Sequence, residues 1–156
     1  MKFEKMVDVS TEIIINLPKE KVAEFASDPG NAPSWCTHIK SVEWNNDAPL
    51  RAGARLVVNE QILRRSLQQV YEVVEIIPGQ KMIMKTSGNG MGMETTVAWQ
   101  ALNENATCMT LRNRGVPVAF KPIAPFWKLA IRSASRRNLK QLKKMLELSC
   151  RRLVVL

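Results

Sequence analysis

The chain has 156 residues, of which 46% are hydrophobic and 24% charged, and its formal net charge is +9. These values are typical of one folded domain with its own core, and they exclude a wholly disordered chain. No apolar run reaches the roughly 18 residues that a membrane-spanning helix needs, and the first residues lack the apolar stretch of a signal peptide. Three widely spaced cysteines, Cys36, Cys108 and Cys150, favour reduced thiols and therefore a cytoplasmic protein.

The positive charge is concentrated toward the C-terminal end. Residues 1–111 carry 11 basic and 13 acidic side chains, whereas residues 112–156 carry 12 basic and 1 acidic. Such a local excess attracts anions, for example phosphate head groups, nucleic acid or acidic proteins, although a basic face also serves solubility alone. Nucleic acid is not the favoured partner, because the basic face offers no aromatic side chain on which bases stack.

In chain order, the first element is a strand over Val7–Ile15, where apolar and polar residues alternate. Asn16-Leu17-Pro18 then begins a short helix, which Asp28-Pro29-Gly30 ends. Residues 29–38 contain two prolines and are expected to form a loop with room for a single helical turn.

Residues 39–112 show the patterns of strands and turns. The expected strands are Ile39–Trp44, Arg55–Ile62, Leu67–Ile77, Lys81–Thr86, Met93–Leu102 and Thr107–Arg112. Pro78-Gly79 predicts a tight turn. The glycine-rich segment Ser87–Gly92 predicts a hairpin loop, because a phosphate-binding loop would lead into a helix and not into a strand.

The chain closes with a long amphipathic helix, expected from about Pro125 to Leu148 and followed by a tail over 149–156. At ~100° per residue, one arc of this helix is apolar and the opposite arc is cationic. The apolar arc holds Trp127, Ala130, Ile131, Ala134, Leu142 and Met145, with Asn138 among them and Ser135 near its edge. The cationic arc holds Lys128, Arg132, Arg136, Arg137, Lys140, Lys143 and Lys144, together with Leu129 and Leu139.

Consecutive strands followed by a long helix define the fold class. Runs of strands form an antiparallel sheet, and a helix of ~24 residues spans about 36 Å, enough to cover the inner face of a curved sheet. The sequence therefore predicts an α+β fold, in which a curved antiparallel sheet of about seven strands wraps around a long C-terminal helix. Short helices are expected between strands 1 and 2.

Four segments resemble the helix-grip superfamily, which includes START domains, the birch-pollen allergen fold and polyketide cyclase/dehydrase-like proteins. They are IINLPKEKVAEFASDP, NAPSWCTHIKSVEW, LQQVYEVVEIIPGQKMIMKT and IAPFWKLAIRSASRRNLKQLKKMLE. The resemblance spans roughly residues 7–148 and implies one domain over 1–156. It also implies a deep, mostly apolar cavity between sheet and helix, used for lipids, polyketides, sterols or quinones. None of the four segments is a catalytic signature.

Eight residues are expected at this cavity: Trp35, Tyr71, Met82, Met84, Trp99, Trp127, Ile131 and Asn138. Methionine and aromatic side chains suit a wall that adapts to varied apolar shapes, but the same residue types also fill ordinary cores. A buried amide such as that of Asn138 needs a partner in the sheet, in water or in a ligand.

The residues allow three functions. The first is binding or transport of a hydrophobic small molecule between sheet and helix. The second is a polyketide cyclase or dehydrase type of enzyme, in which His38 or Tyr71 would move a proton. The third is a lipid- or quinone-handling accessory protein whose helix docks on an anionic membrane through Arg136, Arg137, Lys140 and Lys144.

Metal, cofactor and nucleophilic chemistry find little support in the sequence. A zinc site needs about four ligands, whereas His38 is the only histidine and the cysteines are scattered. No dinucleotide or phosphate-loop motif is present. Cys36 and His38 lie two residues apart, but closeness of this kind is common in extended segments and does not define a nucleophilic pair. We therefore expect no metal and no cofactor.

Overall fold

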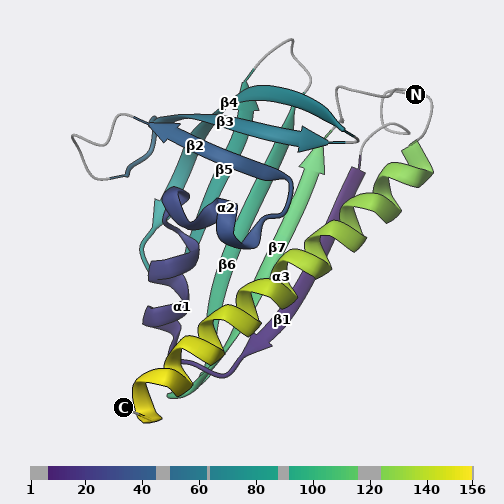
Figure 1. Ribbon diagram of the computed structural model, residues 1–156. Coiled ribbons are helices and arrows are strands. Elements are labelled where there is room, and N and C mark those ends of the chain that lie inside the picture. Colours follow the sequence, from purple (N-terminus) through teal and green to yellow (C-terminus); the bar gives the residue numbers. More distant parts are fainter. Residues whose placement is uncertain (1–6, 45–49, 63, 88–91, 116–123, 156) are drawn as a thin grey trace.

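The computed structural model describes residues 7–44, 50–62, 64–87, 92–115 and 124–155 (Figure 1). The elements are β1 (Val7–Ile15), α1 (Lys19–Ala26), η2 (Pro29–Asn31), α2 (Ala32–Trp35), β2 (Ile39–Trp44), β3 (Arg55–Ile62), β4 (Arg65–Ile77), β5 (Lys81–Ser87), β6 (Met93–Asn103), β7 (Ala106–Gly115) and α3 (Ala124–Val155). Seven strands form one antiparallel sheet in the order β1-β7-β6-β5-β4-β3-β2. The predicted fold class is confirmed.

Several element bounds differ from those expected. Residues 29–38 contain two short helical segments, η2 and α2, where a single turn was expected, and the Asp28 side chain caps the first by accepting from Gly30 N at 2.9 Å. The expected tail over 149–156 is wrong as far as Val155, because α3 continues to that residue and the sequence offers no glycine or proline to stop it. Most of the glycine-rich segment, residues 88–91, lies outside the described residues.

Cross-strand register assigns each side chain to one face of the sheet, because directly paired residues point to the same side. Val73 pairs with Met84, Met82 with Val97, and Trp99 with Met109, and these residues form the inner face. Figure 1 shows α3 crossing this inner side obliquely, alongside β1, with α1 and α2 on the same side of the sheet. The outer face of the sheet carries mostly charged and polar side chains.

The core lies where α1, α2 and the C-terminal half of α3 meet the sheet. Its buried members are Ile15, Leu17, Val22, Ala23, Ala26, Trp35, Met82, Val97, Trp99, Met109, Leu111, Leu139 and Leu142. Helix α3 contributes no buried side chain between Lys128 and Ala134. The tightly packed part of the interior is therefore displaced toward one end of the helix.

The expected orientation of α3 is partly wrong. Leu139, expected on the cationic arc, is only 1% exposed, and Ala130, expected on the apolar arc, is exposed. Among the side chains of α3 that the structure describes, the buried ones are Ser135, Asn138, Leu139 and Leu142. The alanines biased the sequence pattern toward their side of the helix, whereas the large leucines bury more apolar area and determine which side faces the sheet.

Candidate functional site

The inner face of the sheet is buried on one side and open on the other. On β1, next to α3, Val7 and Val9 are 3% and 1% exposed. The inner-face side chains of β4 to β7 farther from the core stay partly exposed, and we call this set the open inner face: Gln69, Tyr71, Met84, Thr86, Met93, Thr95 and Asn113. Since these side chains point toward the inner side, their accessible surface lies within the curve of the sheet.

A buried carboxylate lies beside the open inner face. Glu60 on β3 is 3% exposed and shares its side of the strand with Leu56 and Val58. Its Oε1 accepts a hydrogen bond from the Tyr71 hydroxyl at 2.5 Å, and its Oε2 accepts from Gln69 Nε2 at 3.0 Å. The β3–β4 pairing positions both donors, because it sets Leu56 opposite Tyr71 and Val58 opposite Gln69.

The segment between α2 and β2 is fixed from two sides. Asn138 Oδ1 on α3 accepts from Thr37 N at 3.2 Å and from Thr37 Oγ1 at 3.4 Å. On the other side, Gln61 N donates to the backbone oxygen of His38 at 2.8 Å. These bonds hold Cys36 and His38 beside β3, and they show that the amide of Asn138 has a partner within the protein.

Burial and the charge of Glu60 together determine the protonation of this cluster. Burial raises the pKa of the Cys36 thiol to about 12, with Glu60 adding to the effect, so this cysteine does not supply a thiolate at neutral pH. Burial lowers the pKa of His38 below 6.5 and the charge of Glu60 opposes the shift, which leaves the imidazole neutral at pH 7. Burial, and then Glu60, raise the pKa of Tyr71 well above 10, so its hydroxyl keeps its proton.

A second polar group joins the sheet to α3. Thr95 Oγ1 on β6 donates to Asn113 Oδ1 on β7 at 3.0 Å, and Asn113 Nδ2 donates to Ser135 Oγ on α3 at 3.1 Å. Ser135 is buried, whereas Thr95 and Asn113 belong to the open inner face. The inner side therefore has two polar positions, one on β3 and β4 and one at β6, β7 and α3.

The sequence-predicted site residues fall into different environments. Trp35, Met82 and Trp99 are buried in the core, and the indole nitrogens of Trp35 and Trp99 have no hydrogen-bond partner among the described residues. Met84 packs partly against the core, and Ile131 is half-buried on α3. The side chain of Trp127 lies outside the described residues. Tyr71 and His38 are brought together around Glu60.

Sequence reasoning missed Glu60 and Gln69. Glu60 stands between Asn59 and Gln61, and three polar residues in a row do not show which of them is buried. A usable signal was nevertheless present, because Leu56, Val58 and Glu60 follow one another at the period of two that places residues on one face of a strand. Within the described ranges, no group of three His, Cys, Asp or Glu side chains is arranged to hold a metal ion.

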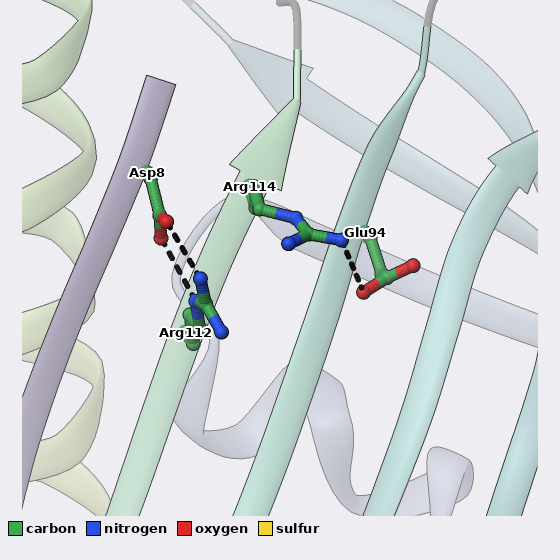
Figure 2. Close-up of polar contacts among 4 residues, drawn as sticks. All are labelled: Asp8, Glu94, Arg112 and Arg114. Atoms are coloured by element: carbon green, nitrogen blue, oxygen red, sulfur yellow. Dashed lines mark hydrogen bonds and ion pairs between the residues drawn. The ribbon is translucent and has the colours of Figure 1, made fainter. Parts of the chain in front are cut away.

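The outer face differs from the inner face in that its charges neutralise each other. Figure 2 shows Arg112 on β7 bonding to Asp8 on β1 at 2.6 and 2.9 Å, and Arg114 reaching Glu94 on β6 at 3.6 Å. Ion pairs also join β5 to β4 (Lys81–Glu75 at 3.5 Å and Lys85–Glu72 at 3.9 Å).

Helix α3 lacks this neutralisation. Arg136, Arg137, Lys140 and Lys144 are exposed, and none of them forms an ion pair with a described residue. An open surface depression beside them is lined by Lys140, Lys143, Lys144, Glu147 and Leu148. These four cations therefore place positive charge without an ion-pair partner among the described residues on the outer side of this helix.

Comparison with known proteins agrees with the fold. The profile of the family described as polyketide cyclase / dehydrase and lipid transport matches residues 6–147, so the chain belongs to this family. A search of curated protein sequences gave no match.

Solved structures share the fold at low sequence identity. A START superfamily protein from Mycobacterium smegmatis has a TM-score of 0.76 at 17% identity, covering 90% of this chain and 97% of that one. The Zhui aromatase/cyclase from Streptomyces sp. R1128 has a TM-score of 0.77 at 12% identity, covering 91% and 94%. A protein from Thermus thermophilus has a TM-score of 0.74 at 16% identity, covering 91% and 98%. Together with the family match over residues 6–147, these structures confirm the predicted resemblance to the START-like, helix-grip superfamily.

Proposed function

We propose that this protein binds or carries a hydrophobic small molecule between the sheet and α3. The observation that carries the proposal is the open inner face, where apolar Met84 and Met93 alternate with a few polar groups and keep accessible surface on the inner side of the sheet. Ligand sites combine apolar walls with a small number of orienting polar groups in this way. Membership of a family whose description includes lipid transport agrees with it.

The first test is native mass spectrometry of the purified protein, followed by organic extraction of whatever it releases. A hydrophobic passenger in a one-to-one ratio would support the proposal and give the chemical class. An empty protein that also binds no member of a panel of fatty acids, fatty alcohols, alkylphenols, quinones and aromatic polyketides would refute it. The free thiols of Cys36, Cys108 and Cys150 suit a reducing compartment, and we propose the cytoplasm as the place of binding.

An enzyme of the cyclase or dehydrase type is the second candidate. The observation that favours it is that His38 and Tyr71 both lie near Glu60, where burial lowers the pKa of the imidazole and raises that of the phenol. A neutral imidazole can accept a proton and a phenol can donate one. In this case His38→Ala would abolish turnover of a poly-carbonyl substrate while ligand binding remains. Equal turnover by His38→Ala and the wild type would remove His38 from any catalytic role.

A membrane-surface accessory role is the third candidate. It is favoured by the exposed cations of α3, which stand next to exposed Leu129 and Leu148 on the same helix. Among the residues that the structure describes, no helix is both long and apolar enough to cross a bilayer, so contact with a membrane would be made from its surface. Failure to co-sediment at low salt with vesicles containing phosphatidylserine would eliminate this candidate.

A further inference from the structure

The buried cluster around Glu60 has more hydrogen-bond acceptors than donors. An ionised carboxylate is an acceptor only, with about four lone-pair positions, and Tyr71 and Gln69 occupy one position on each oxygen of Glu60. Tyr71 donates its only O–H in this bond, and its phenolic oxygen accepts no hydrogen bond from a described residue. Gln69 keeps one N–H and its carbonyl oxygen. What the cluster can still offer to a ligand is therefore mainly acceptor capacity.

This cluster reaches the ligand space through its partners. Glu60 itself is 3% exposed, whereas Tyr71 and Gln69 are partly exposed members of the open inner face. The loop bearing His38 closes the other side of Glu60, fixed there by Asn138 and by Gln61 N. A ligand lying along the open inner face would therefore meet the free lone pairs of Tyr71 and Gln69, with the negative charge of Glu60 directly behind them.

We propose that Glu60, Tyr71 and Gln69 form a polar anchor that selects hydrophobic ligands ending in a neutral hydrogen-bond donor, such as an alcohol or phenol hydroxyl, and rejects those ending in a carboxylate. The inference rests on the proposed binding function and adds the chemistry of the ligand's polar end. A hydroxyl donates its proton to the acceptor-rich cluster. A carboxylate brings a second negative charge toward Glu60 and has no proton to donate.

Three probes with one alkyl chain and different polar ends test the anchor: 4-nonylphenol, its methyl ether and 4-nonylbenzoate. Binding is followed by calorimetry on the full chain at neutral pH. The phenol should bind at least about tenfold more tightly than the ether, which cannot donate, and than the benzoate, which is charged. This comparison uses the wild-type protein, so it stands even where a variant fails to fold.

Glu60→Gln provides the direct test of the charge. The amide has nearly the same shape, lacks the charge and gains two N–H donors, so the benzoate should gain affinity and the preference for phenol over benzoate should collapse. Glu75→Gln is the matched control, because Glu75 lies on the outer face in an ion pair with Lys81 and its loss should leave the preference unchanged.

The outcomes separate the anchor from the binding function. Equal affinities of the three probes would overturn the anchor and leave hydrophobic binding in place. A tighter benzoate in the wild type would also overturn it. Binding of none of the probes, together with an empty protein in native mass spectrometry, would overturn both proposals. An unchanged preference in folded Glu60→Gln would show that the selection does not come from this carboxylate.

Discussion

Among single residues, the buried carboxylate of Glu60 depends most on hydrogen bonds from its neighbours. A carboxylate that is 3% exposed has lost most of its hydration, and this loss costs several kcal/mol unless hydrogen bonds replace the water. Tyr71 and Gln69 supply those bonds. Because both also belong to the open inner face, the same contacts stabilise the fold and form part of the proposed ligand site.

Tyr71→Phe removes one donor from this carboxylate without removing the ring. A hydrogen bond to a charged group contributes about 1.5–3 kcal/mol, so we expect the free energy of unfolding to fall by about that amount. Urea denaturation measures the change. Gln68→Met is the control, since Gln68 donates to Asn59 in an exposed contact and its loss should cost about 0.5 kcal/mol or less. Equal losses in the two variants would contradict a special role for the buried carboxylate.

The pKa of His38 can be measured directly from the pH dependence of one NMR signal. It is the only histidine, so its imidazole proton resonance titrates alone in NMR spectra. Because burial lowers its pKa, the midpoint should fall below 6.5, and in Glu60→Gln it should fall further, since the charge that opposes the shift is gone. A midpoint at or above 6.5 would contradict the lowered pKa, because the charge of Glu60 would then outweigh the effect of burial.

The same shift has a consequence for stability. When the pKa is lower in the folded than in the unfolded state, the unfolded state takes up the proton first as pH falls. The contribution of His38 is therefore complete above about pH 6.5 and is lost as pH falls through the lowered value. Unfolding measured between about pH 8 and about pH 5 should show a smaller loss in His38→Gln than in the wild type.

Whether the sequence predicts the environment of a single residue depends on whether the contacts of that residue follow from the local pattern. Asn138 was recognisable, because an amide among apolar residues of a helix must find a partner, and that partner is Thr37. Glu60 was not recognised, because its burial comes from the loop at His38 and from β4, and contacts across the fold do not appear in a local pattern. Trp35 and Trp99 were expected at the cavity, and the structure places both among the buried residues of the core.

At the scale of elements, strands were easier to predict than the orientation of the helix. The bounds of β2 and β3 match those expected, since alternation over six to eight residues and turn residues on either side define a strand locally. The orientation of α3 depends on which side chains reach the sheet, and there Leu139 and Leu142 outweigh the alanines. A helical pattern counts Ala and Leu equally as apolar positions, although a buried Leu removes more apolar area from water than a buried Ala does.

Leu139→Ala tests that orientation against Leu129→Ala on the same helix. Leu139 is 1% exposed and belongs to the core, so its truncation should lower the free energy of unfolding by about 2–5 kcal/mol. Leu129 is 63% exposed, and its truncation should change the free energy by about 0.5 kcal/mol or less. Similar losses in the two variants, by urea denaturation, would contradict the observed orientation of α3.

At the scale of the whole molecule, the net charge of +9 is not spread evenly. Ion pairs join β1 to β7, β7 to β6 and β5 to β4 across the outer face of the sheet, as Figure 2 shows for its first two pairs. On α3, Lys143 is held by Ile14 O at 2.7 Å and by Glu147 at 2.8 Å. The exposed cations nearby have no such partner among the described residues, so their positive charge stays available to an anionic surface.

Neutralising four of these cations, in Arg136→Gln, Arg137→Gln, Lys140→Gln and Lys144→Gln together, tests the membrane-surface candidate. Each cation near an anionic bilayer contributes about 1 kcal/mol, so binding to phosphatidylserine vesicles should weaken by at least about a hundredfold. Binding by the wild type should also fall between about 0.1 M and about 1 M salt, because the screening length shortens from ~10 Å to ~3 Å.

The matched control neutralises four exposed arginines beyond the helix, Arg51, Arg55, Arg64 and Arg65, and lowers the net charge by the same amount. Vesicle co-sedimentation should be nearly unchanged in this variant if the docking surface is α3, because the four arginines come from β3, β4 and the segments before them. If both quadruple variants lose binding equally, attraction depends on net charge alone and α3 is not a docking surface. If only the α3 variant loses vesicle binding while both keep the hydrophobic ligand, the surface that docks and the interior that binds are separate parts of one molecule.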